Sequence, residues 1–111
     1  MEEMDSLEMI CFGIISHVGV AKTSYINAIA KAKEGDFEAA EALIKEGDVA
    51  YNEGHDIHMK LLQSEAAGER EPVAPLILLH AEDQMASTEM AKIMALDFID
   101  AYREIEALKN A

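Results

Sequence analysis

The stretch KEGDF, from Lys33 to Phe37, separates two long helical segments and so decides the fold of this chain. Gly35 suits the left-handed conformation in which helices commonly end, and Asp36 is a good N-cap for a helix that begins after it. Before this stretch, from about residue 4 to 33, apolar residues recur with the period of a helix. They are Leu7, Ile10, Ile14, Val18, Ala21, Tyr25 and Ile29. The sequence therefore predicts a first helix that ends at a tight turn.

A second helical period begins directly after the turn. Its apolar positions are Phe37, Ala40, Ile44, Ala50 or Tyr51, Ile57 and Leu61. Gly47 and Gly54 are weak points inside this segment, because a glycine within a helix costs about 1 kcal/mol relative to alanine. The pattern fades in the polar loop SEAAGEREP, residues 64–72. We expect the second helix to end there.

The third helical segment follows two prolines. Pro72 or Pro75 can occupy the opening turn of a helix, where the missing N–H costs nothing. The helical pattern then continues to about Leu108. A chain of 111 residues without internal repeats indicates one domain, spanning residues 1–111. The predicted fold is all-α, an antiparallel three-helix bundle.

Composition and charge narrow the classes of partner. Half of the residues are apolar but only 5% are aromatic, a composition that favours helix over sheet. The net charge of −13 argues against binding to nucleic acid or to an anionic membrane surface, because phosphate groups would repel it. We expect a partner with a basic face.

Three further features indicate a cytoplasmic protein that does not insert into a membrane. Cys11 is the only cysteine, so no intramolecular disulfide can form and a reducing compartment is expected. The N-terminal sequence MEEMDSLE is acidic where a secretory signal would be basic. The longest uncharged run, Met9 to Ala21, has 13 residues. A helix that spans a bilayer needs roughly 20.

The third helical segment carries more apolar surface than one bundle needs. At about 100° per residue most of its charged side chains fall on a single stripe. They are Glu82, Glu89, Lys92, Asp97, Asp100, Arg103 and Glu104. The apolar residues form two further stripes: one of Ile77, Ala81, Met85, Ala95 and Ile99, and one of Met90, Met94, Phe98, Ala101 and Ile105. One stripe suffices for the chain's own core, so the second predicts contact with other copies of the chain.

His80 and Asp83 lie on the side of the second stripe, in LLHAEDQMAST, residues 78–88. We therefore expect both side chains to lie among buried residues. A carboxylate in such a place is costly unless it is paired or bound to a metal. His80 has two interpretations: a core or interface histidine bonded to a backbone carbonyl, or a nucleophilic imidazole at a subunit interface that carries a phosphoryl group.

Other histidines offer a weaker candidate site. His55 and His58, with Glu53 and Asp56 nearby, have a spacing found in zinc sites, although such a site needs three or four ligands. The alternative is a half-exposed polar face. His17 is assigned no role.

Several catalytic motifs are absent from the sequence. They include the glycine-rich phosphate loops, the G-x-S-x-G nucleophile motif, His-Glu-x-x-His and the Glu-x-x-His of di-iron bundles. An enzyme of this size would therefore receive an already activated group. The acidic surface and the seven methionines equally fit an adaptor that only docks onto partners.

The segments described above resemble the lactose/cellobiose family of IIA components of the bacterial sugar phosphotransferase system. GIISHVGVAKTSYINAIAKAKEGDFEAAEALI (residues 13–44) is similar to that family's first helix, its glycine-aspartate turn and the start of its second helix. NEGH (52–55) and SEAAGE (64–69) resemble the end of the second helix and the following loop. LLHAEDQM (78–85) resembles the motif around the phosphorylated histidine. The resemblance covers nearly the whole chain.

The resemblance implies a phosphotransferase component that forms a homotrimer of three-helix subunits. His80 matches the histidine that accepts phosphate from the phosphocarrier HPr and passes it to a cysteine of the cognate IIB component. The transported sugar would be a disaccharide such as lactose, cellobiose or chitobiose. Asp83 matches an aspartate that meets its two symmetry copies around a metal ion on the threefold axis. Oxygen-only ligands favour a hard divalent ion such as Mg²⁺, one per trimer.

The chain departs from the family's motif, which often reads His-Ala-Gln-Asp-His-Leu-Met-Thr. Here Glu82 replaces the glutamine, Gln84 replaces the second histidine, and residues 85–87 read Met-Ala-Ser. Glu82 is expected to add negative charge near the phosphate, and Gln84 removes a basic donor. Two other interpretations therefore stay open: a non-catalytic trimeric helical adaptor, and a metal-dependent bundle that uses His55 and His58.

Overall fold

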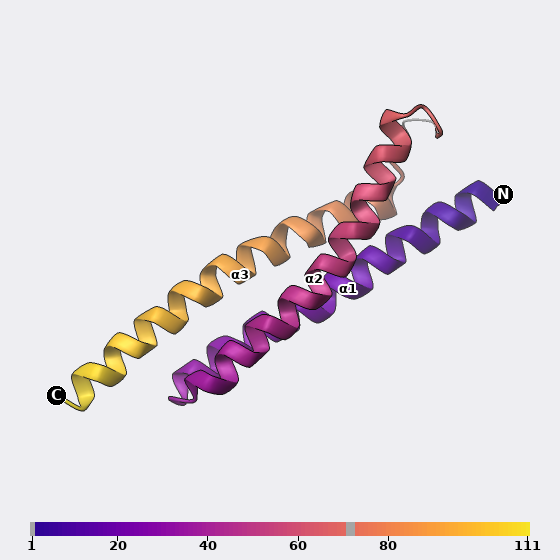
Figure 1. Cartoon of the computed structure of the whole chain (residues 1–111). Coiled ribbons are helices and arrows are strands. Elements are labelled where there is room, and N and C mark those ends of the chain that lie inside the picture. Colours follow the sequence, from indigo (N-terminus) through magenta and orange to yellow (C-terminus); the bar gives the residue numbers. More distant parts are fainter. Residues whose placement is uncertain (1, 71–72) are drawn as a thin grey trace.

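The computed structural model describes residues 2–70 and 73–111, and in these residues it consists of three long helices without strands. They are α1 (Glu2–Lys33), α2 (Phe37–Ala66) and α3 (Leu76–Lys109). The chain runs along α1, returns along α2 and reverses again into α3, within an elongated body of 63 × 20 × 18 Å (Figure 1). The predicted all-helical class and the three helical segments are confirmed.

The turn between α1 and α2 has the predicted geometry. Gly35 has a φ of 86°. Its N–H donates to the Ala32 carbonyl at 3.0 Å, and the N–H of Asp36 donates to the Lys31 carbonyl at 2.9 Å. These two bonds form the Schellman arrangement that closes a helix. Asp36 then caps α2, because its Oδ1 accepts a bond from the Ala39 N–H at 3.1 Å.

A proline also precedes α3. Pro75 is its N-cap, with φ −65° and ψ 160°, one position before the opening turn in which the sequence placed a proline. Its carbonyl accepts bonds from the N–H groups of Leu78 at 3.0 Å and Leu79 at 3.2 Å. The alternative proline, Pro72, lies outside the described residues.

α1 is the central helix of the bundle. It packs against both α2 and α3, whereas α2 and α3 contact each other at few positions in the described part of the chain. Its buried apolar residues follow the predicted period: Cys11, Ile14, Val18, Ala21, Tyr25, Ala28 and Ala32. The half of α1 near the turn packs with Ile44, Ala50, Ala95 and Ile99, and the other half packs with Leu61, Leu78, Ala81 and Met85. α1 therefore forms the middle of both halves of the core. Because α2 and α3 contact each other at few positions, the bundle is open between them.

Ion pairs join α2 to α3 where apolar contact is sparse. They are Glu41 with Arg103, Asp48 Oδ1 with Lys92 Nζ at 2.8 Å, and His58 Nε2 with Glu82 Oε1 at 2.7 Å. We call these pairs the α2–α3 bridges. An ion pair near the surface contributes at most about 1 kcal/mol, so α2 and α3 are held together mainly through α1.

Gly47 and Gly54 were expected to weaken α2, and both are places where α2 approaches α1 closely. A Cβ on Gly47 would lie 2.5 Å from Cε1 of Tyr25, and a Cβ on Gly54 would lie 2.9 Å from Cγ1 of Val18. Both glycines are buried. Their cost in helix propensity is offset by the close packing that they allow.

The two apolar stripes of α3 have different environments. Ala81, Met85, Ala95 and Ile99 of the first stripe are buried in the chain's own core. The opposite side of α3 is apolar but uncovered, and we call it the outer face. Its large residues are each at least 41% exposed: Leu76, Leu79, Met90, Met94, Phe98, Ile105 and Leu108. An exposed apolar row of this length marks an interaction site.

By length and composition alone, the segment of α1 from Ser6 to Lys33 could cross a membrane. This segment is longer than the 13-residue uncharged run considered above, because it includes isolated charged residues. A core helix meets the same criterion, and one side of this segment forms the middle of the core.

Candidate functional site

His80 and Asp83 lie in the second turn of α3, and both side chains are exposed in the single chain. They point away from Ala81 and Met85, which are buried against α1. The sequence placed the pair among buried residues, but the chain's own helices do not bury it. The reason is that the outer face of α3, including Met90, is uncovered. Only another molecule can bury the pair.

Polar contacts hold α3 on both sides of Asp83. On the α2 side, Glu82 Oε1 lies 2.7 Å from His58 Nε2. On the α1 side, Lys22 Nζ donates to Gln84 Oε1 at 3.2 Å. Residues 82 and 84 leave the helix about 200° apart, because each residue advances by about 100°. α3 is therefore tied to both other helices at the level of Asp83.

The turn that follows Asp83 is also anchored to α1. Thr88 is buried, and its hydroxyl lies 2.7 Å from the Gln84 carbonyl and 3.3 Å from the Val18 carbonyl. The Ser87 hydroxyl donates to the same Gln84 carbonyl at 3.1 Å. These contacts add to the apolar packing of this part of α3.

The contact with His58 gives the Glu82 carboxylate a partner on α2. The sequence predicted that its charge would lie near the phosphate acceptor. Glu82 and His80 leave α3 about 200° apart, and the Glu82 carboxylate is bound on the α2 side. Within one chain its charge is therefore directed away from His80. Gln84 stands where the family's motif has a basic residue, but the ammonium of Lys22 lies beside it.

The remaining histidines are not arranged as metal ligands. In the described part of the chain no three His, Cys, Asp or Glu side chains are placed to hold a metal ion. His58 bonds across to α3, and His55 lies against the ring of Tyr51 with centroids 6.1 Å apart. His17 Nδ1 lies 2.9 Å from Glu53 Oε2. The geometry gives no support to a metal-dependent bundle built on His55 and His58.

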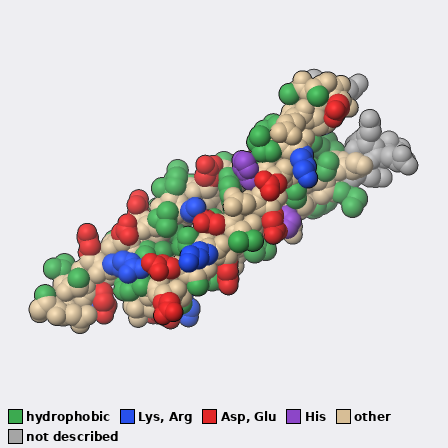
Figure 2. All heavy atoms as spheres, in the orientation of Figure 1, with side chains coloured by type: hydrophobic (Ala, Val, Ile, Leu, Met, Phe, Trp, Pro, Cys, Tyr) green, Lys and Arg blue, Asp and Glu red, His purple; other side chains and the backbone are tan. Residues whose placement is uncertain are grey.

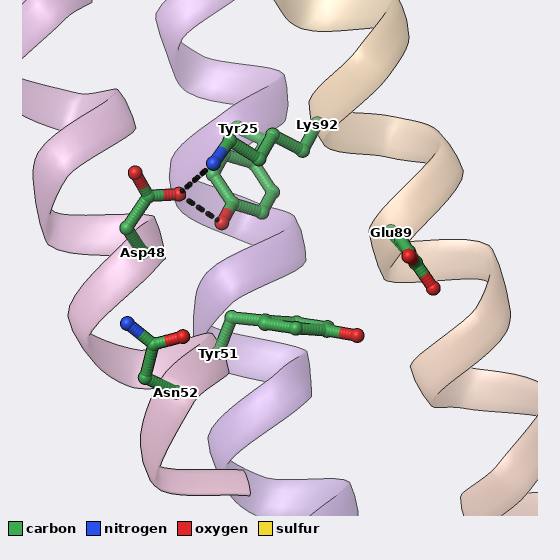
Figure 3. Close-up of a pocket in the computed structure, with 6 residues that line it drawn as sticks. All are labelled: Tyr25, Asp48, Tyr51, Asn52, Glu89 and Lys92. Carbon is green, nitrogen blue, oxygen red and sulfur yellow. Dashed lines mark hydrogen bonds and ion pairs between the residues drawn. The ribbon is translucent and has the colours of Figure 1, made fainter. Parts of the chain in front are cut away.

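A polar pocket of about 250 Å³ lies between α2 and α3 (Figure 3). Asp48 Oδ1 accepts a bond from the Tyr25 hydroxyl at 2.7 Å and pairs with Lys92 Nζ at 2.8 Å. Burial, reinforced by Asp48, raises the pKa of Tyr25 well above its usual range. Burial and the charge of Glu89 raise the pKa of Tyr51. These groups bridge the helices, so we assign the pocket a structural role.

The surface around these features is acidic. The chain has 22 Asp and Glu residues against 9 Lys and Arg. Figure 2 shows acidic side chains spread along the visible face, with apolar patches between them. A docking partner with a basic face complements this surface.

Comparison with known protein families identifies the family of this chain. Residues 9–103 match the family described as PTS system, Lactose/Cellobiose specific IIA subunit. The chain belongs to this family. A relative, the N,N'-diacetylchitobiose-specific EIIA component of Escherichia coli strain K12, is 31% identical over 105 residues, which are 95% of this chain and 90% of the relative.

Two solved structures of IIA proteins have the same fold. The crystal structure of the cellobiose-specific enzyme IIA from Bacillus anthracis has a TM-score of 0.85 and 33% identity, and covers 89% of this chain and 90% of that one. The solution structure of the chitobiose IIA of Escherichia coli in complex with HPr has a TM-score of 0.78 and 29% identity. The match covers 90% of this chain and 96% of that one. The resemblance read from the sequence is confirmed: this IIA subunit is a phosphotransferase-system component for a sugar.

Proposed function

We propose that this IIA subunit carries a phosphoryl group on His80. It accepts the group from phospho-HPr and passes it to the cysteine of a cognate IIB component during uptake of a disaccharide such as lactose, cellobiose or chitobiose. The position of His80 carries the proposal, because the side chain is exposed on α3 within LLHAEDQM in a chain with the IIA fold. The relative solved in complex with HPr supports HPr as the donor. We place the carrier in the cytoplasm, where a lone cysteine stays reduced.

The chemistry requires little from the protein beyond an accessible imidazole. A neutral ring nitrogen of His80 attacks the phosphorus of phospho-HPr, and the nitrogen–phosphorus bond forms as the bond from phosphorus to HPr breaks. The IIB thiolate then attacks the same phosphorus and releases the imidazole. Phosphoryl transfer depends on positioning and charge neutralisation more than on covalent help. In the single chain the His80 side chain is exposed, as attack by both proteins in turn requires.

The test is the mass of the intact chain after incubation with phosphoenolpyruvate, enzyme I and HPr. We expect one phosphoryl group per chain, labile in acid and stable in base, as a phosphohistidine is. His80→Ala should take up none, whereas His55→Ala, a matched change of an exposed histidine on α2, should be labelled fully. Full labelling of His80→Ala would contradict the role of His80. A folded wild type that takes up no phosphate would favour the non-catalytic adaptor.

We also propose that the chain assembles as a homotrimer around the outer face of α3. Cyclic assembly would cover the exposed apolar row and bring the three copies of Asp83 together on the axis. Light scattering during gel filtration should give about three times the mass of one 12.2 kDa chain. A monomer at micromolar concentration would contradict this arrangement.

Asp83 is the proposed metal ligand of the trimer. Asp83 lies exposed on the outer-face side of α3, and among the described residues of one chain no three His, Cys, Asp or Glu side chains are placed to hold a metal ion. The fit therefore depends on three copies. Three carboxylates at close range disfavour one another's ionisation, and a divalent cation offsets this repulsion. Oxygen ligands suit Mg²⁺, one ion per trimer.

A further inference from the structure

We propose that His58 is a positioning residue for the phosphoryl acceptor. Through its bond to Glu82, it sets the rotation of α3 about its own axis and therefore the direction in which His80 and Asp83 point. The inference rests on the proposed carrier function and adds to it a residue on another helix.

Two directional contacts hold α3 at the level of Asp83, one on each side of the direction in which Asp83 projects. Glu82 is held by His58 of α2 at 2.7 Å, and Gln84 is held by Lys22 of α1 at 3.2 Å. At about 100° per residue, Asp83 projects midway between these two contacts. A change in either contact would turn α3 and move the outward-facing side chains with it.

Apolar packing at this level restrains rotation weakly. The buried α3 side chains here are Leu78, Ala81 and Met85, which pack in one apolar cluster with α1 and with Leu61 of α2. Apolar attraction is non-directional, alanine is small, and methionine adapts to its surroundings. The next bridge to α2, at Lys92, lies ten residues farther along α3, about 15 Å at 1.5 Å per residue. The His58 bond therefore supplies the local directional link to α2.

The contact between His58 and Glu82 is largely sheltered from solvent on its His58 side. The His58 side chain is 13% exposed, whereas the Glu82 side chain is 47% exposed. With a proton on Nε2, His58 donates to the carboxylate whether the ring is neutral or charged, and bonds to a charged acceptor are stronger than neutral ones.

Small rotations of α3 matter for group transfer. A rotation of about 10° moves an atom at a radius of about 6 Å by about 1 Å, since a helix with its side chains is about 10–12 Å wide. A misplacement of about 1 Å from a distant change can lower a rate by roughly a hundredfold. The phosphoryl acceptor His80 lies at about this radius, so its rate of phosphorylation should report the rotation.

The experiment measures single-turnover phosphorylation by phospho-HPr over a range of HPr concentrations. His58→Leu should lower the rate constant at saturating phospho-HPr about fivefold, the factor that corresponds to the about 1 kcal/mol of an ion pair near the surface. The HPr concentration at half-maximal rate and the final extent of labelling should stay unchanged. His58→Gln, whose amide can still donate to Glu82, should retain most of the rate. His55→Leu, the matched control on the exposed side of α2, should react as the wild type does.

A second variant keeps the test independent of the folding of His58→Leu. Glu82→Leu removes the acceptor instead of the donor and should lower the rate by the same factor, and the double variant should be no slower than either single one. A wild-type rate for His58→Leu would overturn the positioning role and leave the carrier function standing, as would equal losses in His58→Leu and His58→Gln. A wild type that accepts no phosphate would overturn the carrier function and this inference with it.

Discussion

Gly47→Ala should destabilise the bundle although alanine is the better helix former. A Cβ at this position would lie 2.5 Å from Cε1 and 2.8 Å from Cδ1 of Tyr25. The ring cannot move away freely, because it is fully buried and its hydroxyl is bonded to Asp48 at 2.7 Å. Alanine gains about 1 kcal/mol in helix propensity over glycine. Overpacking of a core costs about 1–3 kcal/mol. A contact this short should cost an amount at the upper end of that overpacking range. After the gain in helix propensity is subtracted, the free energy of unfolding should fall by about 2 kcal/mol.

The assay is thermal unfolding followed by far-ultraviolet circular dichroism. A loss of about 2 kcal/mol should lower the melting temperature by about 8 °C for a domain of this size. All variants must be compared at one protein concentration, because assembly makes the melting temperature depend on concentration. Gly19→Ala is the matched control, since a Cβ at this helical glycine meets no atom within 4 Å. It should raise the melting temperature by about 4 °C.

The outcome that refutes the reasoning is a Gly47→Ala protein that melts at or above the wild-type temperature. α1 and α2 would then be farther apart at this level, or Tyr25 would be free to shift its ring. If the melting temperature rises in Gly19→Ala and falls in Gly47→Ala, the close approach of α2 to Tyr25, and not helix propensity, decides the effect at Gly47.

Three further predictions concern other parts of the molecule. Gly35→Val should lower the free energy of unfolding by about 1 kcal/mol or more, because a φ of 86° strains a residue with a Cβ; an unchanged melting temperature would speak against the left-handed turn. Asp83→Leu should remain trimeric by light scattering, lose its metal and become less sensitive to chelators and pH, because apolar replacement of buried ionic groups is often neutral or stabilising. A monomeric Asp83→Leu with intact helices would rule out the axial site. Burial raises the pKa of Tyr25 above 10.0, so its contribution to stability is complete below pH 10 and is lost as the pH rises towards the raised value. Tyr25→Phe should therefore flatten the alkaline fall in stability in urea titrations, and an unchanged slope would assign that fall to other groups.

The helices were predictable because their signals are local. The KEGDF turn needs only Gly35 and Asp36, and both act through neighbours within a few residues. The apolar period of α1 reports its burial directly, since every residue of that period from Ile14 to Tyr25 is buried. Spacing alone does not state which helices pack together, so the open side between α2 and α3 was not expected.

The candidate site was predictable only in part. The motif identified His80 and Asp83, which stand at one turn of α3, but their surroundings depend on residues far away in the sequence. Glu82 meets a residue 24 positions earlier and Gln84 meets one 62 positions earlier. No short-range pattern contains those contacts, which is why the sequence did not give the partner of the Glu82 carboxylate. Nor does one chain's sequence reveal how much of the outer face its copies cover.

The central place of α1 has a consequence for the opening motions of the chain. α2 and α3 each pack on α1 and contact each other at few positions, so α3 can detach while the α1–α2 hairpin stays formed. In a lone chain, backbone amides of α3 should therefore exchange with solvent sooner than those of the hairpin.

α3 is also the helix whose outer face is covered in the proposed trimer. Subunit contacts would then protect the segment that the chain itself holds least firmly, and local opening of α3 and dissociation of a subunit would become one event. Dilution should accelerate amide exchange in α3 and leave exchange in the α1–α2 hairpin nearly constant. The concentration of the chain would thus control the lifetime of the helix that carries His80.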